Sequence, residues 1–430
     1  MTIDTSATFT SGAPAATTAR IRQAGLLMAV VGIVLVVVGY VVDPAHFYHT
    51  YVVGYAFWMA ITVGFLALYL LHNLVSGAWG FALRRLMEAG VTALPLMLVL
   101  FVPVALGAFN GSLYEWSHAD VVAKDHILQH KEAWLNLPFW GVRVIVYFVI
   151  WIFFGWMAMR INARQEKLGP GAPPLTRTLQ RVSGAGLVIL LLTFTFAGID
   201  WYKSLEPHWF STIYGILMIA GAALGAITLL TLLITRYADY EPLKSYINKR
   251  VLHDFGNLMF ALNMFWAYIS FSQFIIIWSG NVAEETPWYH VRINHGWEII
   301  AWSLVFLHFA FSFLALLSRK KKRSLRYLAS IAVWLLIMRL VDLIWVIGPS
   351  ERIMLAGHGG EGNYPLTIHW QYIASTLAVG GLWLFWVTTR LKDKPLLPVY
   401  DPRLQDAHFR VEHLEPHLPG VSEAEDLRPA

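Results

Sequence analysis

Residues 199–215 read I-D-W-Y-K-S-L-E-P-H-W-F-S-T-I-Y-G, a polar island between two long apolar runs. Each of the flanking runs, at residues 182–198 and 212–235, is long enough to cross a bilayer as a helix, which needs ~20 mostly apolar residues. Trp201 and Trp209 lie within the island, and indole side chains prefer the depth at which water meets lipid. The island is therefore predicted to be a tight turn at one membrane face.

The composition places the chain among integral membrane proteins. Its mean hydropathy is +0.54, with 57% hydrophobic and only 14% charged residues, whereas soluble domains carry ~25% charged residues. The sequence has no cysteine, which excludes disulfides, thiolate-held iron–sulfur clusters, thioether-linked haem and a cysteine nucleophile within this chain. The net charge of +5 predicts no nucleic-acid binding, because Lys and Arg in a membrane protein sort by topology.

Ten apolar runs predict an all-α polytopic membrane protein with ten transmembrane helices. They divide the chain into an N-terminal arm at 1–23, a membrane domain at 24–390 with its longest outer loop at 110–137, and a C-terminal strap at 391–430. The runs lie at residues 24–42, 52–73, 91–109, 138–160, 182–199, 212–235, 255–279, 297–317, 326–347 and 367–388.

The basic residues indicate the orientation. Of the 32 lysines and arginines, 25 lie in the two tails and the connections on the same side of the membrane, five lie in the other connections, and two lie within or at the edge of runs. Connections rich in Lys and Arg face the cytoplasm. Both termini are therefore predicted to be cytoplasmic.

Ionisable groups inside a bilayer are costly and each suggests a function. Arg339 and Asp342 are three residues apart on the ninth run, so they share a helix face and can neutralise one another. Glu298 lies just inside the outer end of the eighth run, and four further residues come from the outer ends of others: Asp200, Glu206, His295 and His369. We expect these groups to form a polar cluster on the outer side.

His308 is the one histidine expected near mid-membrane. It follows Glu298 by ten residues, which corresponds to ~15 Å along a helix. His72, His253 and Asp254 are expected at cytoplasmic ends of runs. These residues suggest a proton path or half-paths with carboxylates and imidazoles as relay groups. The alternative is a buried ion pair that fixes helix register, with one hydrogen-bonded core histidine.

Other site types are not expected from this sequence. Two bound haems need pairs of mid-membrane histidines on facing helices, which one histidine at that depth cannot provide. The chain has no glycine-rich phosphate loop, no HExxH helix and no hydrolase elbow. No catalytic residue, metal site or cofactor is therefore predicted within the chain.

Several long motifs resemble one family. The stretch D-W-Y-K-S-L-E-P-H-W-F-S-T-I-Y-G from Asp200 is similar to a signature of the NrfD-like (polysulfide-reductase-type) membrane subunits of alternative complex III, a bacterial quinol oxidoreductase. Three further segments agree: H-N-L-V-S-G-A-W-G-F-A-L-R-R-L-M-E at 72–88, L-H-D-F-G-N-L-M-F-A at 252–261 and W-A-Y-I-S-F-S-Q-F-I-I-I-W-S-G-N-V-A-E-E-T-P-W-Y at 266–289. The ten runs and the S-G-N after Trp278 resemble the ActF-type subunit, although Ala283 stands where the family has proline.

The resemblance implies two antiparallel four-helix bundles, runs two to five and six to nine, plus flanking helices. It implies a scaffolding and proton-conducting subunit of a quinol:cytochrome c or quinol:oxidase oxidoreductase in the bacterial cytoplasmic membrane, not catalytic alone. The quinol, such as menaquinol, the haem c and the iron–sulfur clusters would belong to partners: a second NrfD-like subunit, an iron–sulfur protein, cytochrome c subunits and a terminal oxidase. Two alternatives are a quinol-binding catalytic subunit of the same complex and a stand-alone transporter.

Overall fold

The structure is a computed structural model that describes residues 13–168, 173–350, 365–391, 395–398, 401 and 403–404. Ten helical segments in these residues are long and apolar enough to cross a membrane, which confirms the predicted all-α, multi-pass class. They are α1 (Ala15–Val42), α2 (Pro44–Val75), α3 to α5 (Ala78–Val91, Leu94–Leu100 and Val102–Phe109), α8 (Leu137–Leu168), α9 (Thr176–Trp201) with η2 (Lys203–Leu205), α10 (Tyr214–Ile234), α12 (Lys249–Gly280), α14 (Trp297–Ser303) with η3 (Leu304–Phe311) and α15 (Ser312–Leu317), α17 (Leu325–Ile347) and α19 (Gln371–Leu391).

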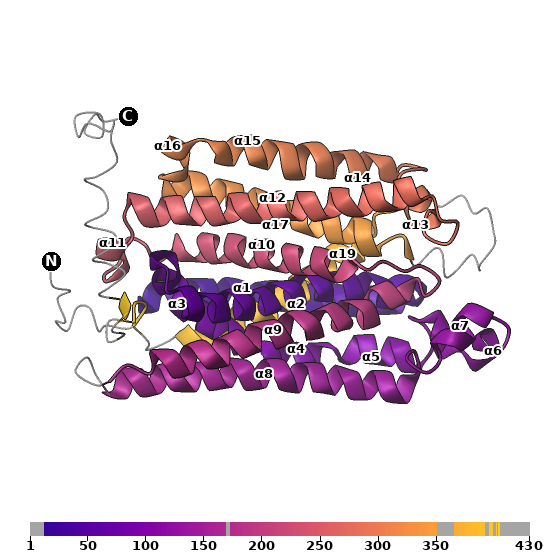
Figure 1. Cartoon of the computed structure of the whole chain (residues 1–430), viewed down its shortest axis with the longest axis horizontal. Helices are drawn as coiled ribbons and strands as arrows, with labels where there is room; N and C mark the ends of the chain where they lie inside the picture. The colour runs from indigo at the N-terminus through magenta and orange to yellow at the C-terminus, as the bar shows by residue number, and fades with distance from the viewer. Residues whose placement is uncertain are drawn as a thin grey trace.

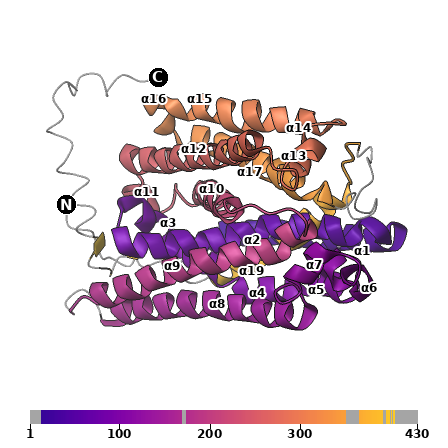
Figure 2. The same ribbon diagram turned by 45° about the vertical axis from the view of Figure 1, so that its right-hand side comes forward.

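The spanning helices run along one common axis and alternate in direction (Figure 1). We call the end where α1 begins and α19 finishes the tail end, and the opposite end the loop end. The tail end carries α11 (Leu243–Tyr246) and α16 (Arg319–Lys322), and the loop end carries η1 (Glu115–Ser117), α6 (Ala119–Val122), α7 (His126–Lys131) and α13 (Pro287–Arg292), as the turned view in Figure 2 also shows.

Helix α1 begins earlier than the sequence pattern predicts. Its first residue is Ala15, so the second half of the predicted arm at 1–23 is helical, and residues 1–12 lie outside the described part of the chain. Pro14 immediately precedes the helix, where a missing N–H has no effect, and alanines open it. Arg20 and Arg22 interrupt the apolar pattern but do not end the helix. The helix therefore begins before the uninterrupted apolar run.

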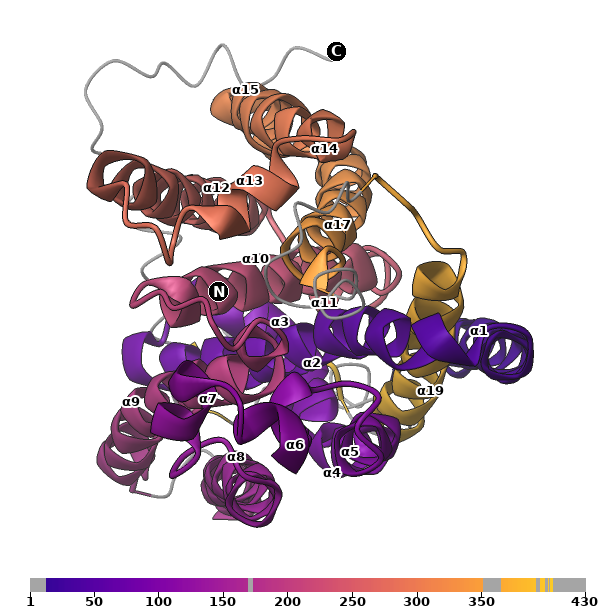
Figure 3. The same cartoon turned by 90° about the vertical axis from the view of Figure 1, so that its right-hand side faces the viewer.

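Helix α2 lies at the centre of the molecule. It packs against α10, α19, α3 and α9, while α10 also packs against α12 and α17 (Figure 3). The contact between α2 and α10 is close because Gly64 has no side chain: a Cβ there would lie 2.2 Å from the carbonyl oxygen of Ala222. The two halves of the chain therefore meet backbone to backbone along these helices.

The first and last spans pack on each other. Gly25, Gly32 and Gly39 recur every seven residues on α1 and face α19. A Cβ at Gly32 would lie 2.2 Å from the nitrogen of Ala378, and one at Gly381 would lie 2.1 Å from the nitrogen of Ala29. Small residues of this kind let helix backbones approach within a membrane.

The segment 110–137 lies over the polar island at the loop end. His208 Nε2 is 2.6 Å from Asp125 Oδ2, and the Lys131 ammonium donates to the carbonyl of Pro207. Burial would by itself raise the pKa of Asp125, but the hydrogen bond from His208 and two backbone N–H groups lower it. Charged side chains of the longest loop therefore bind this loop to the turn after α9.

Candidate functional site

The buried pair on α17 forms as the sequence predicts. Arg339 donates through Nη1 to Oδ2 of Asp342, and the two residues are only 3% and 4% exposed. Gly221 on α10 makes room for the guanidinium, since a Cβ there would lie 2.0 Å from Nη2 of Arg339. An isolated buried charge would be strongly unfavourable, and the pairing offsets part of that penalty.

A second buried pair joins the polar island to α13. Arg292, which is fully buried, donates through Nη2 and Nη1 to the two carboxylate oxygens of Glu206. Its guanidinium lies 3.8 Å from the ring centre of Trp288, and its Nη2 also donates to the carbonyl of Val346 at 2.7 Å. Tyr214 at the start of α10 is buried, and Arg292, Glu206 and Asp342 are close enough to act electrostatically on its hydroxyl.

His308 lies in a π-helical segment, η3. Such wide turns are rare and occur frequently at functional sites. The imidazole is fully buried, its ring centre is 3.9 Å from that of Trp266, and the charge of Arg339 acts on it. Neither ring nitrogen has a hydrogen-bond partner among the described residues. Buried polar groups are nearly always hydrogen-bonded, so the ring is expected to bind ordered water.

Polar side chains continue from His308 toward the tail end. Asn263 on α12 donates to the carbonyl of Phe309 at 3.4 Å, and Ser312 is buried one turn after His308. At the tail end, Lys322 donates to Asn257 at 2.6 Å, and Asn257 is 3.2 Å from His253 Nδ1. We call the buried series that runs from the Glu206–Arg292 pair to Ser312 the polar path; its members are Glu206, Arg292, Tyr214, Asp342, Arg339, His308, Asn263 and Ser312.

The predicted relay residues do not all join the polar path. Glu206, His308, Arg339 and Asp342 belong to it, while His253 and Asp254 lie on α12 near the tail end and are partly exposed. Glu298 instead accepts from the N–H of Gly296 at 2.8 Å, in its own turn. The carboxylates expected on the outer side are therefore not one cluster.

Asp200 and His72 lie on helices from the first half of the chain, apart from the polar path. Asp200 on α9 pairs with Arg143 on α8, while His72 on α2 is fully buried against Trp79 and Phe81. Asp200 and Glu206 therefore pair with different cations, Arg143 on α8 and Arg292 on α13.

The sequence pattern does not predict Arg143 and Arg292 as ion-pair partners. Arg143 lies near the start of the fourth apolar run, where a lone basic residue is itself a signal of a buried carboxylate nearby, whereas Arg292 lies in a connection and gives no such signal. A network at the tail end is also not predicted from the sequence pattern: there Arg84 and Arg85 bind Glu88 and Glu166 at 2.7–3.0 Å. Arg84 also binds Asp401, so part of the predicted strap at 391–430 contacts this chain itself; most of that strap lies outside the described residues.

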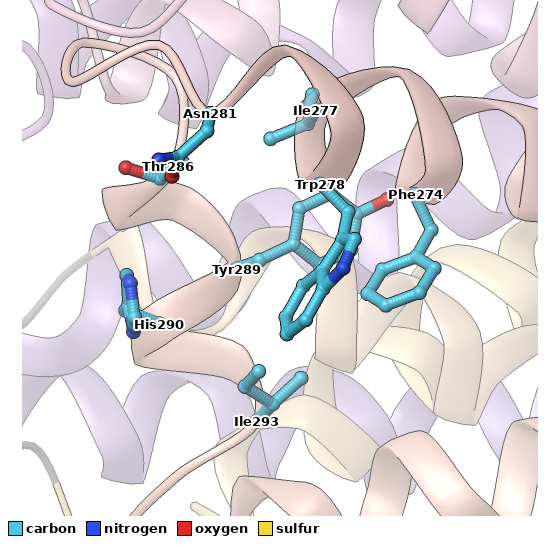
Figure 4. Close-up of a pocket in the computed structure, with 8 residues that line it drawn as sticks. All are labelled: Phe274, Ile277, Trp278, Asn281, Thr286, Tyr289, His290 and Ile293. Carbon is cyan, nitrogen blue, oxygen red and sulfur yellow. The ribbon is translucent and has the colours of Figure 1, made fainter.

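A half-open cavity of about 380 Å³ lies at the loop end between α12 and α13 (Figure 4). Its walls combine apolar and aromatic side chains with an imidazole, a phenol and an amide, a mixture found in small-molecule sites. The lining residues are Phe274, Ile277, Trp278, Asn281, Thr286, Tyr289, His290 and Ile293.

Comparison with protein-family models and with curated proteins gives no match to this chain. The membership in the NrfD-like family therefore stays a prediction from the motifs.

Proposed function

We propose that this chain is a multi-pass subunit of a quinol-oxidising respiratory complex of the alternative complex III type, in which it scaffolds its partners and carries a proton half-path. The observation that carries the proposal is His308, a buried imidazole without a hydrogen bond to any described residue, in a π-helical turn near the Arg339–Asp342 pair. An imidazole can accept and release a proton near neutral pH. Electron transport would run through partner subunits.

The polar path gives this proposal a direction. From the loop end, Glu206 and Arg292 are followed by Tyr214, then by the Asp342–Arg339 pair and His308. Hydroxyl, amide and water would link the charged groups, as in other intramembrane proton relays. No member of the polar path lies between Ser312 and the tail end. The proposed path is therefore a half-path that begins at the loop end.

The orientation and the assembly belong to the same proposal. The Lys and Arg bias supports a cytoplasmic tail end in the bacterial cytoplasmic membrane. The packing of α8 and α9 with α2, and of α12 and α17 with α10, supports the two four-helix bundles that the motifs imply. A second NrfD-like subunit, an iron–sulfur protein, cytochrome c subunits and a terminal oxidase would be the partners.

The test is proton release per quinol oxidised by the intact complex in vesicles. The variants Asp342→Asn and His308→Phe should lower this ratio while the rate of electron transfer without a membrane potential changes little. Glu298→Gln is the matched control, because the Glu298 carboxylate accepts from a backbone N–H in its own turn and is not a member of the polar path. An unchanged ratio in both path variants would leave the chain a structural role alone.

A second candidate is that this chain itself binds the quinol. The cavity beside α13 favours it, since a quinol ring could enter between Trp278 and Tyr289 and place a hydroxyl near His290 as general base. In that case His290→Gln should abolish quinol oxidation and labelling by a photoreactive quinone. If activity and labelling both persist, the quinol site belongs to a partner.

A further inference from the structure

The corner between α1 and α2 meets the start of α19 at the loop end. Asp43 is the single residue between α1 and α2, and His46 lies in the first turn of α2. His369 comes from the far end of the sequence, two residues before α19. The fold thus brings one carboxylate and two imidazoles together from both ends of the chain.

The three side chains converge on one point. Asp43 Oδ1 is 2.7 Å from His46 Nδ1, and the rings of His46 and His369 stack with centres 4.4 Å apart and planes inclined by 27°. One ligand atom from each of the three residues lies within 4.8 Å of the other two. Two ligand atoms bound ~2.0–2.2 Å from one tetrahedral ion lie roughly 3.3–3.6 Å apart, so small side-chain movements would let these three atoms bind a common ion.

The side chains are also accessible. Asp43 and His46 are 35% and 26% exposed, so an ion can reach them from water. One turn further along α2, His49 is buried and its ring nitrogens have no hydrogen-bond partner among the described residues. His49 is close enough to His46 for their charges to interact. This corner is therefore rich in imidazole.

The ligand set selects the class of ion. Calcium and magnesium are bound by oxygen ligands, whereas imidazole suits zinc, copper and nickel. Two imidazoles and one carboxylate are also a common protein ligand set for zinc, with water in the remaining position. Metal binding would replace the proton shared by Asp43 and His46 and release it to solvent.

We propose that Asp43, His46 and His369 bind one divalent transition-metal ion, and that this ion clamps the α1–α2 corner to the start of α19. Because the ligands come from opposite ends of the chain, the ion closes a very long loop and stabilises the folded form. This site lies apart from the polar path, and it is independent of the proposed function.

The experiment uses the full chain, purified in detergent and freed of metal with EDTA. Zinc is added in a calorimetric titration and in thermal unfolding, and cobalt is added to read the visible absorption of a bound ion. Wild type should bind one zinc per chain at this site and unfold at a higher temperature with zinc. His369→Gln and Asp43→Asn should bind zinc at least ~10-fold more weakly and lose the rise in unfolding temperature.

His130→Gln is the matched control, since His130 is an exposed histidine at the same end of the molecule. It should bind zinc and cobalt like wild type. Far-UV circular dichroism without metal shows whether each variant is folded. The proposal is overturned if folded His369→Gln and Asp43→Asn bind zinc as tightly as wild type, or if wild type binds no zinc at micromolar concentrations.

Discussion

Arg143 on α8 donates two hydrogen bonds to Asp200 on α9, from Nε to Oδ2 at 2.7 Å and from Nη2 to Oδ1 at 3.0 Å. The Tyr147 hydroxyl and the Trp134 indole donate to the same carboxylate at 2.7 and 2.8 Å. Both charged residues are buried, at 0% exposure for Asp200 and 6% for Arg143. This paired arrangement fixes the loop ends of two neighbouring helices relative to each other.

Removal of one partner should be strongly destabilising. Asp200→Asn leaves the buried Arg143 without a counter-charge, which costs about 3–5 kcal/mol. We expect a clearly lower midpoint in denaturant-induced unfolding of the detergent-solubilised protein. The double variant Arg143→Met with Asp200→Leu should recover part of the loss, because an apolar pair needs no counter-charge. Equal midpoints for wild type and Asp200→Asn would contradict this account of the pair.

Gly221→Ala should disturb the Arg339–Asp342 pair. The new methyl group would lie 2.0 Å from Arg339 Nη2, so the guanidinium must move. Such overpacking destabilises by about 1–3 kcal/mol. Gly141→Ala on α8 is the control: a Cβ there meets nothing within 4 Å, and the change should stabilise by roughly 0.5–1 kcal/mol. Equal shifts of the unfolding midpoint in Gly221→Ala and Gly141→Ala would show that the guanidinium of Arg339 does not need the absence of a side chain at Gly221.

Gly32→Val should separate α1 from α19. The valine Cβ would lie 2.2 Å from the backbone nitrogen of Ala378, and a backbone cannot turn aside as a side chain can. We expect a loss of about 1–3 kcal/mol and faster proteolytic release of α1. Gly184→Val on α9 is the control, since its nearest neighbour is a side-chain atom of Leu74 at 3.6 Å. A proteolysis rate equal to that of wild type would mean that α1 and α19 do not depend on this contact.

Asp401 should make the attachment of the C-terminal segment pH-dependent. Burial alone would raise its pKa, but hydrogen bonds from Arg403 and the charges of Arg84 and Arg403 lower the pKa from 3.8 to about 2. Because the folded-state pKa is the lower one, the contact stabilises the attached form fully above the ordinary value and is lost as the pH falls through about 2. Pepsin should therefore cleave next to Leu404 faster near pH 2 than near pH 4.

The same contact can be tested at neutral pH. Asp401→Asn removes charged hydrogen bonds, so trypsin should cleave after Arg403 at least ~10-fold faster than in wild type. In this variant the pepsin cleavage should no longer change with acidification beyond the enzyme's own pH dependence. Protection of Arg403 that is unaffected by Asp401→Asn would show that other contacts hold the segment.

The sequence determined the spans and one buried ion pair. Twenty apolar residues in succession can only be helical in lipid, where each backbone polar group must be satisfied within its own segment. Arg339 and Asp342 are near neighbours on one helix, so their contact follows from the helical repeat alone. Properties of this kind depend on residues close together in the chain.

Only the tertiary structure decided which distant groups meet. Glu206 pairs with Arg292, Asp200 pairs with Arg143, and Asp43 and His46 lie beside His369. The partners in each case are far apart in the sequence. The spans are apolar nearly all round, so their periodicity does not reveal which face turns inward. That choice depends on the glycines that let α1, α2 and α10 approach their neighbours and on the need of each buried charge for an opposite one.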